Sequence, residues 1–385
     1  MTVTLAEVAA RAGVSPATVS RVLNGNYPVA AATRERVLRA VDELDYVPNG
    51  PASSLAAATS DLVGILVNDI ADPFFGIMAG AAQSALGEDA AGRAGGGAAG
   101  AGTGSGKLAV VCNTGGSPER ELTYLTLLQR QRAAAVILTG GSLEDDAHQA
   151  AVTAKLARLA EAGTRVVLCG RPPLGDAAEP DAGGPSFATL AFDNRSGARR
   201  LTEHLLTLGH RRIGYVAGPA DRTTTRHRLE GHRAALRAAG VAEGPTAHGP
   251  YDRASGYRAT LELLGSDPDL TAVVAANDTV ALGVCAALRE RGLDIPGDVS
   301  VAGFDDLPFS VDVVPALTTV RLPLYEAGAR AGRLALGAEP APPGGLAAIP
   351  AELVVRGTTA PPRGRGALDH RGGQPLPPAR GHRGR

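Results

Sequence analysis

The first apolar periodicity in the chain covers two short segments separated by a glycine. Residues at helical spacing are apolar within 5–12 and again within 16–24, as one buried face on each of two helices requires. Ser15 fits the N-cap of the second helix, and Pro16 fits its first position. Gly13 tolerates the left-handed backbone that a sharp turn needs. The pattern predicts a helix-turn-helix, the unit that places its second helix in the major groove of DNA.

A third amphipathic segment runs from Thr33 to Leu44, and Thr33 is its expected cap. Three short helices predict a small all-α headpiece, and two interpretations of it stay open: DNA binding, or a helical hairpin that only packs. Residues 1–60 contain five arginines and five acidic residues, so the strongly basic character typical of a DNA-binding domain is absent. We therefore expect modest affinity of a single copy for DNA, strong salt dependence and a need for dimerisation.

From residue 62 onwards, short apolar runs alternate with helical patterns. This alternation predicts an α/β core of parallel sheets covered by helices on both faces, and the continuous Val, Leu and Ile content of the runs fits buried strands. The expected strands are 62–67, 108–112, 135–138, 166–168, 190–192, 212–216, 272–275 and 299–303. The expected helices are 76–86, 119–132, 150–162, 195–208, 226–239, 255–264 and 279–291.

Two segments carry no apolar period and fall outside this pattern. Residues 87–106 are rich in glycine and alanine where a short connection is expected, which favours a flexible insertion. Residues 361–385 contain six arginines and one acidic residue among prolines and glycines, which favours a disordered tail. A solvated tail and a tail that adds nonspecific attraction to DNA are both compatible with this composition.

Composition changes the picture mainly through what it disfavours. Cys112, Cys169 and Cys285 lie in apolar runs without the spacing of zinc ligands, so we expect buried free thiols and neither a metal nor another cofactor. The first residues lack a basic and apolar export signal, and no run approaches the ~20 apolar residues of a membrane span. We expect a cytoplasmic protein without membrane contact. The net charge of −1 says nothing about partners.

Residues 4–55 resemble the headpiece of the LacI (lactose-repressor) family of bacterial transcription regulators. The resemblance rests on the run TLAEVAARAGVSPATVSRVLNG, on the later segments TRERV and LDYVPN, and on Leu55. It implies a helix-turn-helix DNA-binding domain over 1–48 and a hinge helix over 49–60. The hinge departs from the family pattern, because Gly50-Pro51-Ala52 replaces the more usual Arg-Val-Ala.

Carried over by position, the resemblance implies a recognition helix whose side chains face operator DNA. Pro16 and Ala17 occupy positions that often vary with operator sequence; neither can make a bidentate base contact, although Ala17 fits a thymine methyl. Arg21 is the expected contact to guanine or phosphate, and Leu55 matches a leucine that the family inserts into the minor groove. The expected DNA contacts are Thr4, Ser15, Pro16, Ala17, Thr18, Ser20, Arg21, Asn24 and Leu55, with Thr4, Ser15, Thr18 and Asn24 placed on phosphates.

The rest of the chain resembles the periplasmic-binding-protein-like core of the same family. The matching segments include VGILV with DPFF, HLLTLGHRRIG, RLEG, AND, DVSVAGFD and PALTT, in the family's order. The resemblance implies two doubly wound parallel-sheet subdomains that close on a small molecule by hinge motion. The first is expected from 61–192 plus 321–340, and the second from 193–320 plus 346–358.

The loops at the carboxyl ends of the strands supply the expected effector site. Phe74 and Phe75 can stack on a sugar or base, or belong to the core. Arg228 and Asp305 offer a donor fork and a paired acceptor suited to vicinal hydroxyls. Asn277 is compatible with a ligand contact and with a helix cap. Gly170 has no side chain where the family often has an acidic or aromatic one, and Arg171 is expected to take its place. The expected set is Phe74, Phe75, Arg171, Arg222, Thr224, Arg228, Tyr251, Asn277 and Asp305.

The resemblance implies a transcription regulator, most often a repressor, that binds operator DNA as a homodimer under the control of a small-molecule effector. A sugar is the expected effector, and a nucleobase or other metabolite acting as corepressor is the alternative. A sugar-binding receptor without DNA function fits the core but not the headpiece. An enzyme is disfavoured, because the sequence contains neither a Gly-x-Ser-x-Gly nucleophile elbow nor a phosphate-binding glycine loop.

Overall fold

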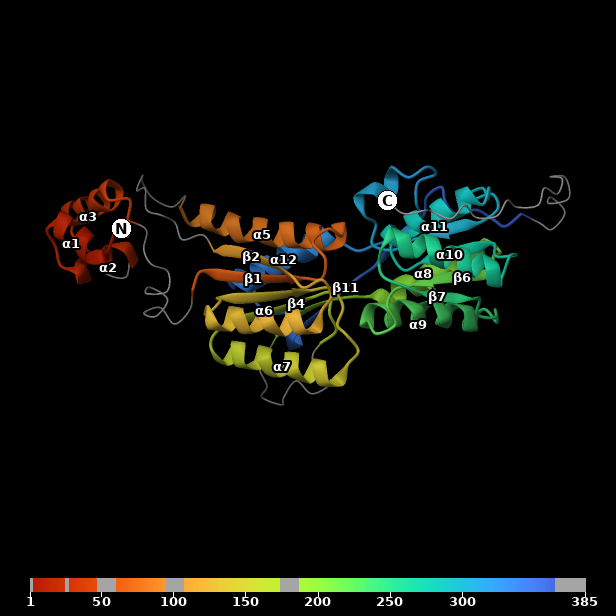
Figure 1. Cartoon of the computed structure of the whole chain (residues 1–385), viewed down its shortest axis with the longest axis horizontal. Coiled ribbons are helices and arrows are strands. Elements are labelled where there is room, and N and C mark those ends of the chain that lie inside the picture. Colours follow the sequence, from red (N-terminus) through yellow and green to blue (C-terminus); the bar gives the residue numbers. More distant parts are fainter. Residues whose placement is uncertain (1–2, 25–27, 47–59, 95–106, 174–186, 364–385) are drawn as a thin grey trace, which may run out of the picture.

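The computed structural model describes residues 3–24, 28–46, 60–94, 107–173 and 187–363. The headpiece consists of three helices that pack around a small apolar core centred on Val8, Val19 and Val37 (Figure 1). Their bounds are Leu5–Ala12 (α1), Pro16–Asn24 (α2) and Ala31–Glu43 (α3). The predicted helix-turn-helix is thereby confirmed, with Gly13 at φ +64° in the turn.

The caps of these helices agree with the sequence in one case and differ in the other. The Ser15 hydroxyl accepts a hydrogen bond from Thr18 N at 3.2 Å, as expected of an N-cap. Thr33 does not cap α3, because the helix begins two residues earlier, at Ala31, and its N-cap residue Ala30 makes no side-chain cap. Alanine is the strongest helix former, so Ala31 and Ala32 extend the helix past the expected start.

The first subdomain is a six-stranded parallel sheet in the order β11-β5-β4-β3-β1-β2. Helices α5 and α12 cover one face of the sheet, and α6 and α7 cover the other (Figure 1). The strands are Leu62–Val67 (β1), Leu108–Asn113 (β2), Ala135–Thr139 (β3), Arg165–Cys169 (β4), Ala188–Phe192 (β5) and Leu346–Ile349 (β11). The helices are Pro73–Ala94 (α5), Pro118–Arg130 (α6), Asp146–Glu161 (α7) and Leu324–Leu336 (α12).

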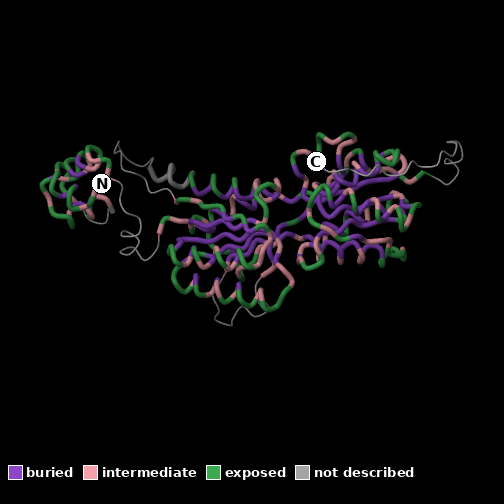
Figure 2. Tube along the Cα trace, viewed as in Figure 1, coloured by how far each residue is buried: buried purple, intermediate pink, exposed green. Residues whose placement is uncertain are grey.

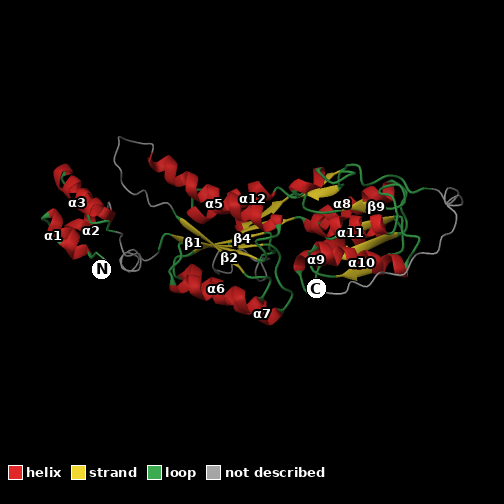
Figure 3. Cartoon of the chain, turned by 45° about the horizontal axis from the view of Figure 1, so that its top comes forward, coloured by secondary structure: helices red, strands yellow, loops and turns green. Residues whose placement is uncertain are grey.

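The second subdomain is a four-stranded parallel sheet in the order β7-β6-β8-β9. Its helices pack in two pairs, α8 with α9 and α10 with α11, and both sheets form buried layers between helices (Figures 2 and 3). The strands are Ile213–Ala217 (β6), Thr246–His248 (β7), Ala272–Ala275 (β8) and Ser300–Ala302 (β9). The helices are Asn194–Thr207 (α8), Thr223–Ala238 (α9), Arg253–Ser266 (α10) and Asp278–Glu290 (α11).

The chain passes between the two sheets after β5 and again near a small antiparallel pair formed by β10 (Thr319–Arg321) and β12 (Glu352–Val354). The expected boundary at 346 is wrong, because β11 lies beside β5 in the first sheet and the chain crosses only after Ile349. Ile349 packs into the core that β5 shares with the helices around it. The edge of β5 would otherwise be unpaired, and β11 covers it.

All eight strands expected from the apolar runs are confirmed within a few residues of their predicted ends. The expected flexible insertion is wrong at its start, because α5 continues through 87–94; alanine-rich sequence sustains a helix without an apolar period. The remainder of the insertion lies outside the described residues.

The expected disordered tail is likewise wrong at its start. Arg363 Nη1 donates to Asp298 Oδ1 at 2.8 Å, so residues 361–363 are held on the second subdomain. The three cysteines are free and buried as predicted. Within the described part of the chain, no helix has the length and apolar content of a membrane span.

Candidate functional site

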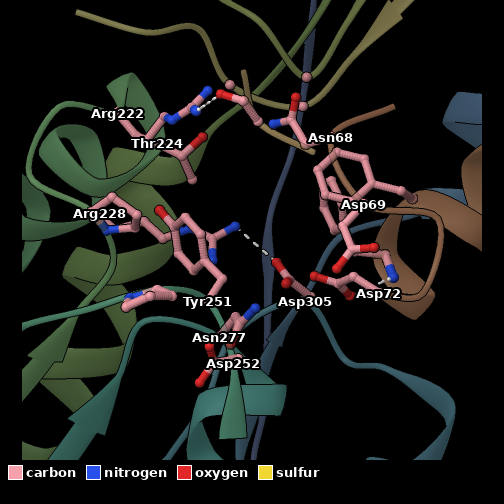
Figure 4. A pocket seen from close by; sticks show the side chains of 18 of the residues that line it. Asn68, Asp69, Asp72, Arg222, Thr224, Arg228, Tyr251, Asp252, Asn277 and Asp305 are labelled. Carbon is pink, nitrogen blue, oxygen red and sulfur yellow. Dashed lines mark hydrogen bonds and ion pairs between the residues drawn. The ribbon is translucent and has the colours of Figure 1, made fainter. Parts of the chain in front are cut away.

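A cleft of about 290 Å³ lies between the two subdomains, at the carboxyl ends of their strands (Figure 4). Its volume is near the lower end of the roughly 300–1,000 Å³ typical of small-molecule sites. The loops after β1, β2, β3, β4 and β5 supply one wall, and the loops after β6, β7, β8 and β9 supply the other. Eight of the nine expected effector residues line the cleft: Phe74, Phe75, Arg222, Thr224, Arg228, Tyr251, Asn277 and Asp305.

Arg228 is the centre of the second-subdomain wall and is only 3% exposed. Its Nε donates to Asn194 Oδ1 at 2.8 Å, its Nη1 to the carbonyl oxygen of Ala276 at 2.6 Å, and its Nη2 to Asp305 Oδ1 at 2.8 Å. The guanidinium carbon also lies 3.8 Å from the centre of the Phe304 ring, within the range of a cation–π contact. These contacts fix the guanidinium plane and leave its remaining N–H donors for a ligand.

Asp305 forms a buried ion pair with Arg228 and has a φ of +104°, which is uncommon for any residue other than glycine. Its backbone N–H donates to the carbonyl oxygen of Val320 at 2.7 Å, so the crossing strand β10 stabilises this conformation. Burial raises the pKa of Asp305, and the adjacent Arg228 opposes that rise by favouring the carboxylate. The pair therefore presents a donor and an acceptor side by side in a desolvated wall.

Two further expected residues are also held by hydrogen bonds within the protein. Asn277 Oδ1 accepts from Val280 N at 2.8 Å, so Asn277 caps α11 and lines the cleft at the same time. Asn277 can therefore cap the helix and contact a ligand in the same conformation. The Tyr251 hydroxyl lies 2.6 Å from Thr225 Oγ1, which fixes the ring against the start of α9.

The first-subdomain wall is aromatic and glycine-rich. Phe74 and Phe75 meet edge to face at 5.0 Å, and Phe192 lies 6.2 Å from Phe74. All three rings line the cleft, but Phe74 is buried in the main core whereas Phe75 is half-buried and presents more of its ring. Gly140, at φ +75°, leaves room for the Phe75 ring, because a Cβ at this position would lie 2.6 Å from Phe75 Cε1.

One side of the cleft is closed by direct contacts between the subdomains, which we call the seam (residues 116 and 140–144 with 221–226). Thr223 N donates to the carbonyl oxygen of Ser142 at 3.0 Å, and Glu144 N donates to that of Asp221 at 2.7 Å. The other seam contacts are a backbone bridge of Leu143 with Arg222, a hydrogen bond from Arg222 Nη2 to the carbonyl oxygen of Gly116 at 2.7 Å, and an ion pair of Arg226 with Glu144.

Arg171 is the one expected effector residue that the structure does not place on the cleft. Its side chain is buried and pairs with Glu121 on α6, whose other oxygen lies 2.9 Å from His148 Nε2. Burial acts to raise the pKa of Glu121, but Arg171 and His148 together outweigh it and leave that pKa below its usual value. A buried carboxylate requires such partners, so the Arg171 side chain pairs with Glu121 and does not reach the cleft.

Several polar residues of the cleft were not predicted from the sequence. Asn68 and Asp69 directly follow β1, and their place after a buried strand was the signal that could have found them. Asp72, which caps α5 through Phe74 N at 3.0 Å, has a pKa raised mainly by burial. The other unpredicted polar residues on the cleft are Asn194 and Asp252. Among the described residues, no His, Cys, Asp and Glu group is arranged to hold a metal ion.

The headpiece presents a second candidate surface on α2. Pro16, Ala17 and Arg21 are exposed, whereas Val19 and Val22 face the headpiece core. This is the division of faces that a recognition helix needs, because the side opposite the core must enter the groove.

The expected phosphate contacts are partly engaged within the headpiece. Thr4 caps α1 in a reciprocal box with Glu7, and the Ser15 and Thr18 hydroxyls lie 2.9 Å apart. Ser20 lies on α2 and is half-buried. The side chain of Asn24 and all of Leu55 lie outside the described residues.

Comparison with known proteins covers both parts of the chain. Residues 4–49 match the family of bacterial regulatory proteins called the lacI family, and residues 202–359 match a periplasmic binding protein-like domain. The HTH-type transcriptional regulator GalR of Escherichia coli K12 is 34% identical over 337 residues, which cover 86% of this chain and 88% of GalR. Relatives named in this way are transcription regulators, which excludes the enzyme interpretation and the receptor without DNA function.

Solved structures agree over almost the whole length. The lac repressor dimer bound to operator and the anti-inducer ONPF has a TM-score of 0.72 and 28% identity, and the match covers 94% of this chain and 100% of that one. The complex of the transcriptional regulator CelR with cellobiose has a TM-score of 0.62 and 32% identity, with 93% and 100% covered. This chain has a headpiece with an exposed recognition face, followed by a two-subdomain core with a cleft. The chain therefore belongs to the LacI family of bacterial transcriptional regulators.

Proposed function

We propose that this regulator is a repressor whose binding to operator DNA is controlled by a small sugar held between the two subdomains. The observation that carries the proposal is the Arg228–Asp305 pair on one wall and the Phe75 ring on the other. A charged donor beside a carboxylate acceptor suits two neighbouring hydroxyl groups, and an aromatic ring suits the apolar face of a sugar ring.

The size of the cleft and the relatives support the same class of ligand. A volume of about 290 Å³ suits a ligand of roughly one sugar ring. The CelR neighbour is named as a complex with cellobiose, which is a sugar. For coupling, a ligand that contacts both walls favours the closed arrangement of the subdomains, and its differential affinity for closed and open forms changes the population that binds DNA.

We further infer that the protein acts as a homodimer. Strand β2 is an edge of the six-stranded sheet, and it exposes Leu108 (64%), Val110 and Val111. An exposed apolar edge strand is normally covered in the functional assembly, and a second copy would also supply the second headpiece for a two-fold operator. Light scattering should give twice the chain mass, and Val110→Arg should lower it to that of a single chain.

The central test joins ligand binding to DNA binding. A thermal-shift screen of sugars with the full chain should identify a ligand, which should then weaken binding to operator DNA selected in vitro by at least about tenfold in fluorescence anisotropy. Arg228→Lys keeps the charge but not the planar fork and should lose the sugar response while still binding operator. Arg237→Lys, at the exposed end of the same helix α9, is the matched control and should respond normally.

The proposal is contradicted if no ligand of the screen changes the affinity for operator. A ligand that strengthens operator binding would instead establish the corepressor alternative.

Binding to DNA should in either case weaken steeply with salt, because phosphate contacts release counterions. Arg21→Ala should reduce the preference for operator over random DNA, since Pro16 and Ala17 offer no bidentate base contact.

A further inference from the structure

The charges around the cleft are unbalanced. The described residues that line it include four carboxylates and two guanidinium groups (Figure 4). The carboxylates belong to Asp69, Asp72, Asp252 and Asp305, and the guanidinium groups to Arg222 and Arg228. In a partly enclosed space, where water screens poorly, such an excess of one sign repels ligands of the same sign.

Neither arginine presents an unbalanced positive charge to the cleft. Arg228 is neutralised by Asp305, and both side chains are almost completely buried. Arg222 donates to the carbonyl oxygen of Gly116 within the seam, and its Nε lies 4.0 Å from Asp221 Oδ1. A phosphate or carboxylate could accept the remaining N–H donors of Arg228, but the charge of that guanidinium group is already balanced by Asp305 inside the protein.

The helix ends at the cleft carry acceptors of their own. A helix N-terminus is a natural anion site, and α5, α10 and α11 all begin here. Asp72 Oδ1 accepts from Phe74 N, and Asp252 Oδ1 accepts from Ser255 N at 2.6 Å. Asn277 does the same for α11. The positions that a ligand anion would use at these helices are thus occupied by side-chain oxygens.

The two ends of the cleft also differ in charge. Figure 4 shows Arg222 and Thr224 at one end, where the seam closes the cleft, and Asp252 toward the other. Asp69 and Asp252 are both exposed at the rim. A ligand approaching the part of the cleft that the seam leaves open therefore meets carboxylates first.

We propose that this cleft admits uncharged and cationic sugars and rejects sugars that carry a phosphate or carboxylate group. The inference rests on the proposed function, since it assigns the charge class of the effector at the same site. It also gives Asp69 and Asp252 a role in selecting the ligand, in addition to the helix-capping role of Asp252.

The test compares sugars that differ only in charge. Calorimetry with the full chain should measure the affinity for galactose, galactosamine, galacturonate and galactose 6-phosphate. The glucose series consists of glucose and the corresponding three derivatives. In whichever series binds, we expect the anionic members to bind at least about tenfold more weakly than the neutral sugar at low salt, and the amino sugar to bind at least as well. The deficit of the anions should shrink at high salt, because screening weakens repulsion.

Variants locate the effect. Asp69→Asn combined with Asp252→Asn should narrow the gap between neutral and anionic members severalfold, and asparagine at 252 retains a good helix cap. Asp146→Asn removes an exposed carboxylate on α7 that lies outside the cleft lining, so it is the matched control and should leave the gap unchanged.

The inference is overturned if anionic sugars bind as tightly as neutral ones, or if the difference in affinity between neutral and anionic sugars is unchanged in the double variant. If anionic sugars bind as tightly as neutral ones, the expected place for the anionic group is the start of α9. Arg222 is the N-cap residue there and provides no side-chain acceptor. Loss of that binding in Arg222→Gln would identify the place. If only anionic sugars bind, the charge selection is wrong while sugar control stands. If neither series binds, the same comparison is made with the sugar that the thermal-shift screen identifies and its charged derivatives; if no sugar of that screen binds, the proposed function fails as well.

Discussion

The two walls of the cleft are built in different ways. On the second-subdomain wall, Arg228, Tyr251 and Asn277 each hydrogen-bond within the protein, and Arg228 does so through three of its nitrogen atoms. On the first-subdomain wall the cleft meets aromatic rings and close-packed glycines such as Gly140 and Gly170, both at positive φ. One wall is thus a fixed polar network, and the other is a shaped apolar surface flanked by the polar residues Asn68, Asp69 and Asp72.

This difference indicates which residues support both the fold and ligand binding, and which support ligand binding alone. A residue of the fixed network supports the fold as well as the ligand, because its removal leaves buried partners without hydrogen bonds. A half-buried ring on the shaped wall supports mainly the ligand. Changes to the second-subdomain wall should therefore reduce the free energy of unfolding, whereas changes to exposed parts of the first should reduce affinity alone.

The largest expected effect comes from breaking the fixed wall. Arg228→Ala should lower the free energy of unfolding by about 3–5 kcal/mol, because Asp305 and the carbonyl oxygen of Ala276 would stay buried without their partner. Urea unfolding followed by circular dichroism measures this loss. Arg237→Ala, at the exposed end of the same helix, should cost less than about 0.5 kcal/mol. A loss below about 1 kcal/mol for Arg228→Ala would mean that the wall is not a fixed network.

The second effect concerns pH and the helices behind the fixed wall. His232 is 1% exposed, its Nδ1 lies 2.8 Å from Thr202 Oγ1, and burial lowers its pKa to about 3. In the unfolded chain a histidine protonates near pH 6.5, so the unfolded state binds more protons between pH 6.5 and 3. Stability is therefore fully present above pH 6.5 and falls as pH drops, by up to about 1.4 kcal/mol per pH unit.

Urea unfolding at pH 7.5 and 5.5 measures this slope. His232→Gln should flatten it, whereas His248→Gln, at an exposed position on β7, should leave it unchanged. An equal slope in the wild-type protein and both variants would assign the acid sensitivity to groups other than His232.

The third effect tests the shaped wall. Phe75→Ala should weaken sugar binding about tenfold, near 1.4 kcal/mol, because the exposed part of this ring is available for stacking. The matched change Phe74→Ala should instead lower the free energy of unfolding by about 3–5 kcal/mol, since that ring is in the core. Phe75→Leu keeps an apolar side chain that fills space but has no ring to stack on the sugar, so it separates the two contributions to affinity. Equal unfolding losses at the two positions would mean that Phe75 supports the fold as much as Phe74 does, so that ligand binding and stability are not separable on this wall.

The smallest effect is expected at the seam, where the walls meet. Glu144 pairs with Arg226 at a partly exposed position, and such pairs contribute about 0.2–1 kcal/mol. Glu144→Gln should change the sugar dissociation constant no more than about fivefold, with Glu161→Gln on α7 as the control. A much larger change would show that this pair, rather than the backbone contacts of the seam, holds the subdomains together.

The sequence alone predicted most strands of the two sheets but missed β7 and β11, and it missed the antiparallel pair β10 and β12. Apolar runs of several residues located every strand from β1 to β6, together with β8 and β9. Strand β11 has only four residues, two of them exposed, and joins a sheet whose other strands end far earlier in the chain. Nothing local in such a segment identifies its partner, because the neighbouring strand β5 selects it in three dimensions.

The site was predictable to the extent that the family's motifs carried it. Arg228 and Asp305 were expected as a donor and an acceptor, and they lie in direct contact. Arg171 was misplaced, because its partner Glu121 is 50 residues away in sequence and no local pattern links the two. Asp252 was missed because its role as the cap of α10 conceals its position on the cleft.

The buried cysteines have a practical consequence for watching the subdomains move. Burial raises the pKa of Cys169 to about 12 and that of Cys285 to about 11, and it raises the pKa of Cys112 as well, so none of the three presents a reactive thiolate at neutral pH. Thiol dyes should then attach only to cysteines introduced on the surface. Asp146→Cys and Arg237→Cys place one label on each subdomain, and energy transfer between the two labels would report closure of the cleft in the otherwise unaltered protein.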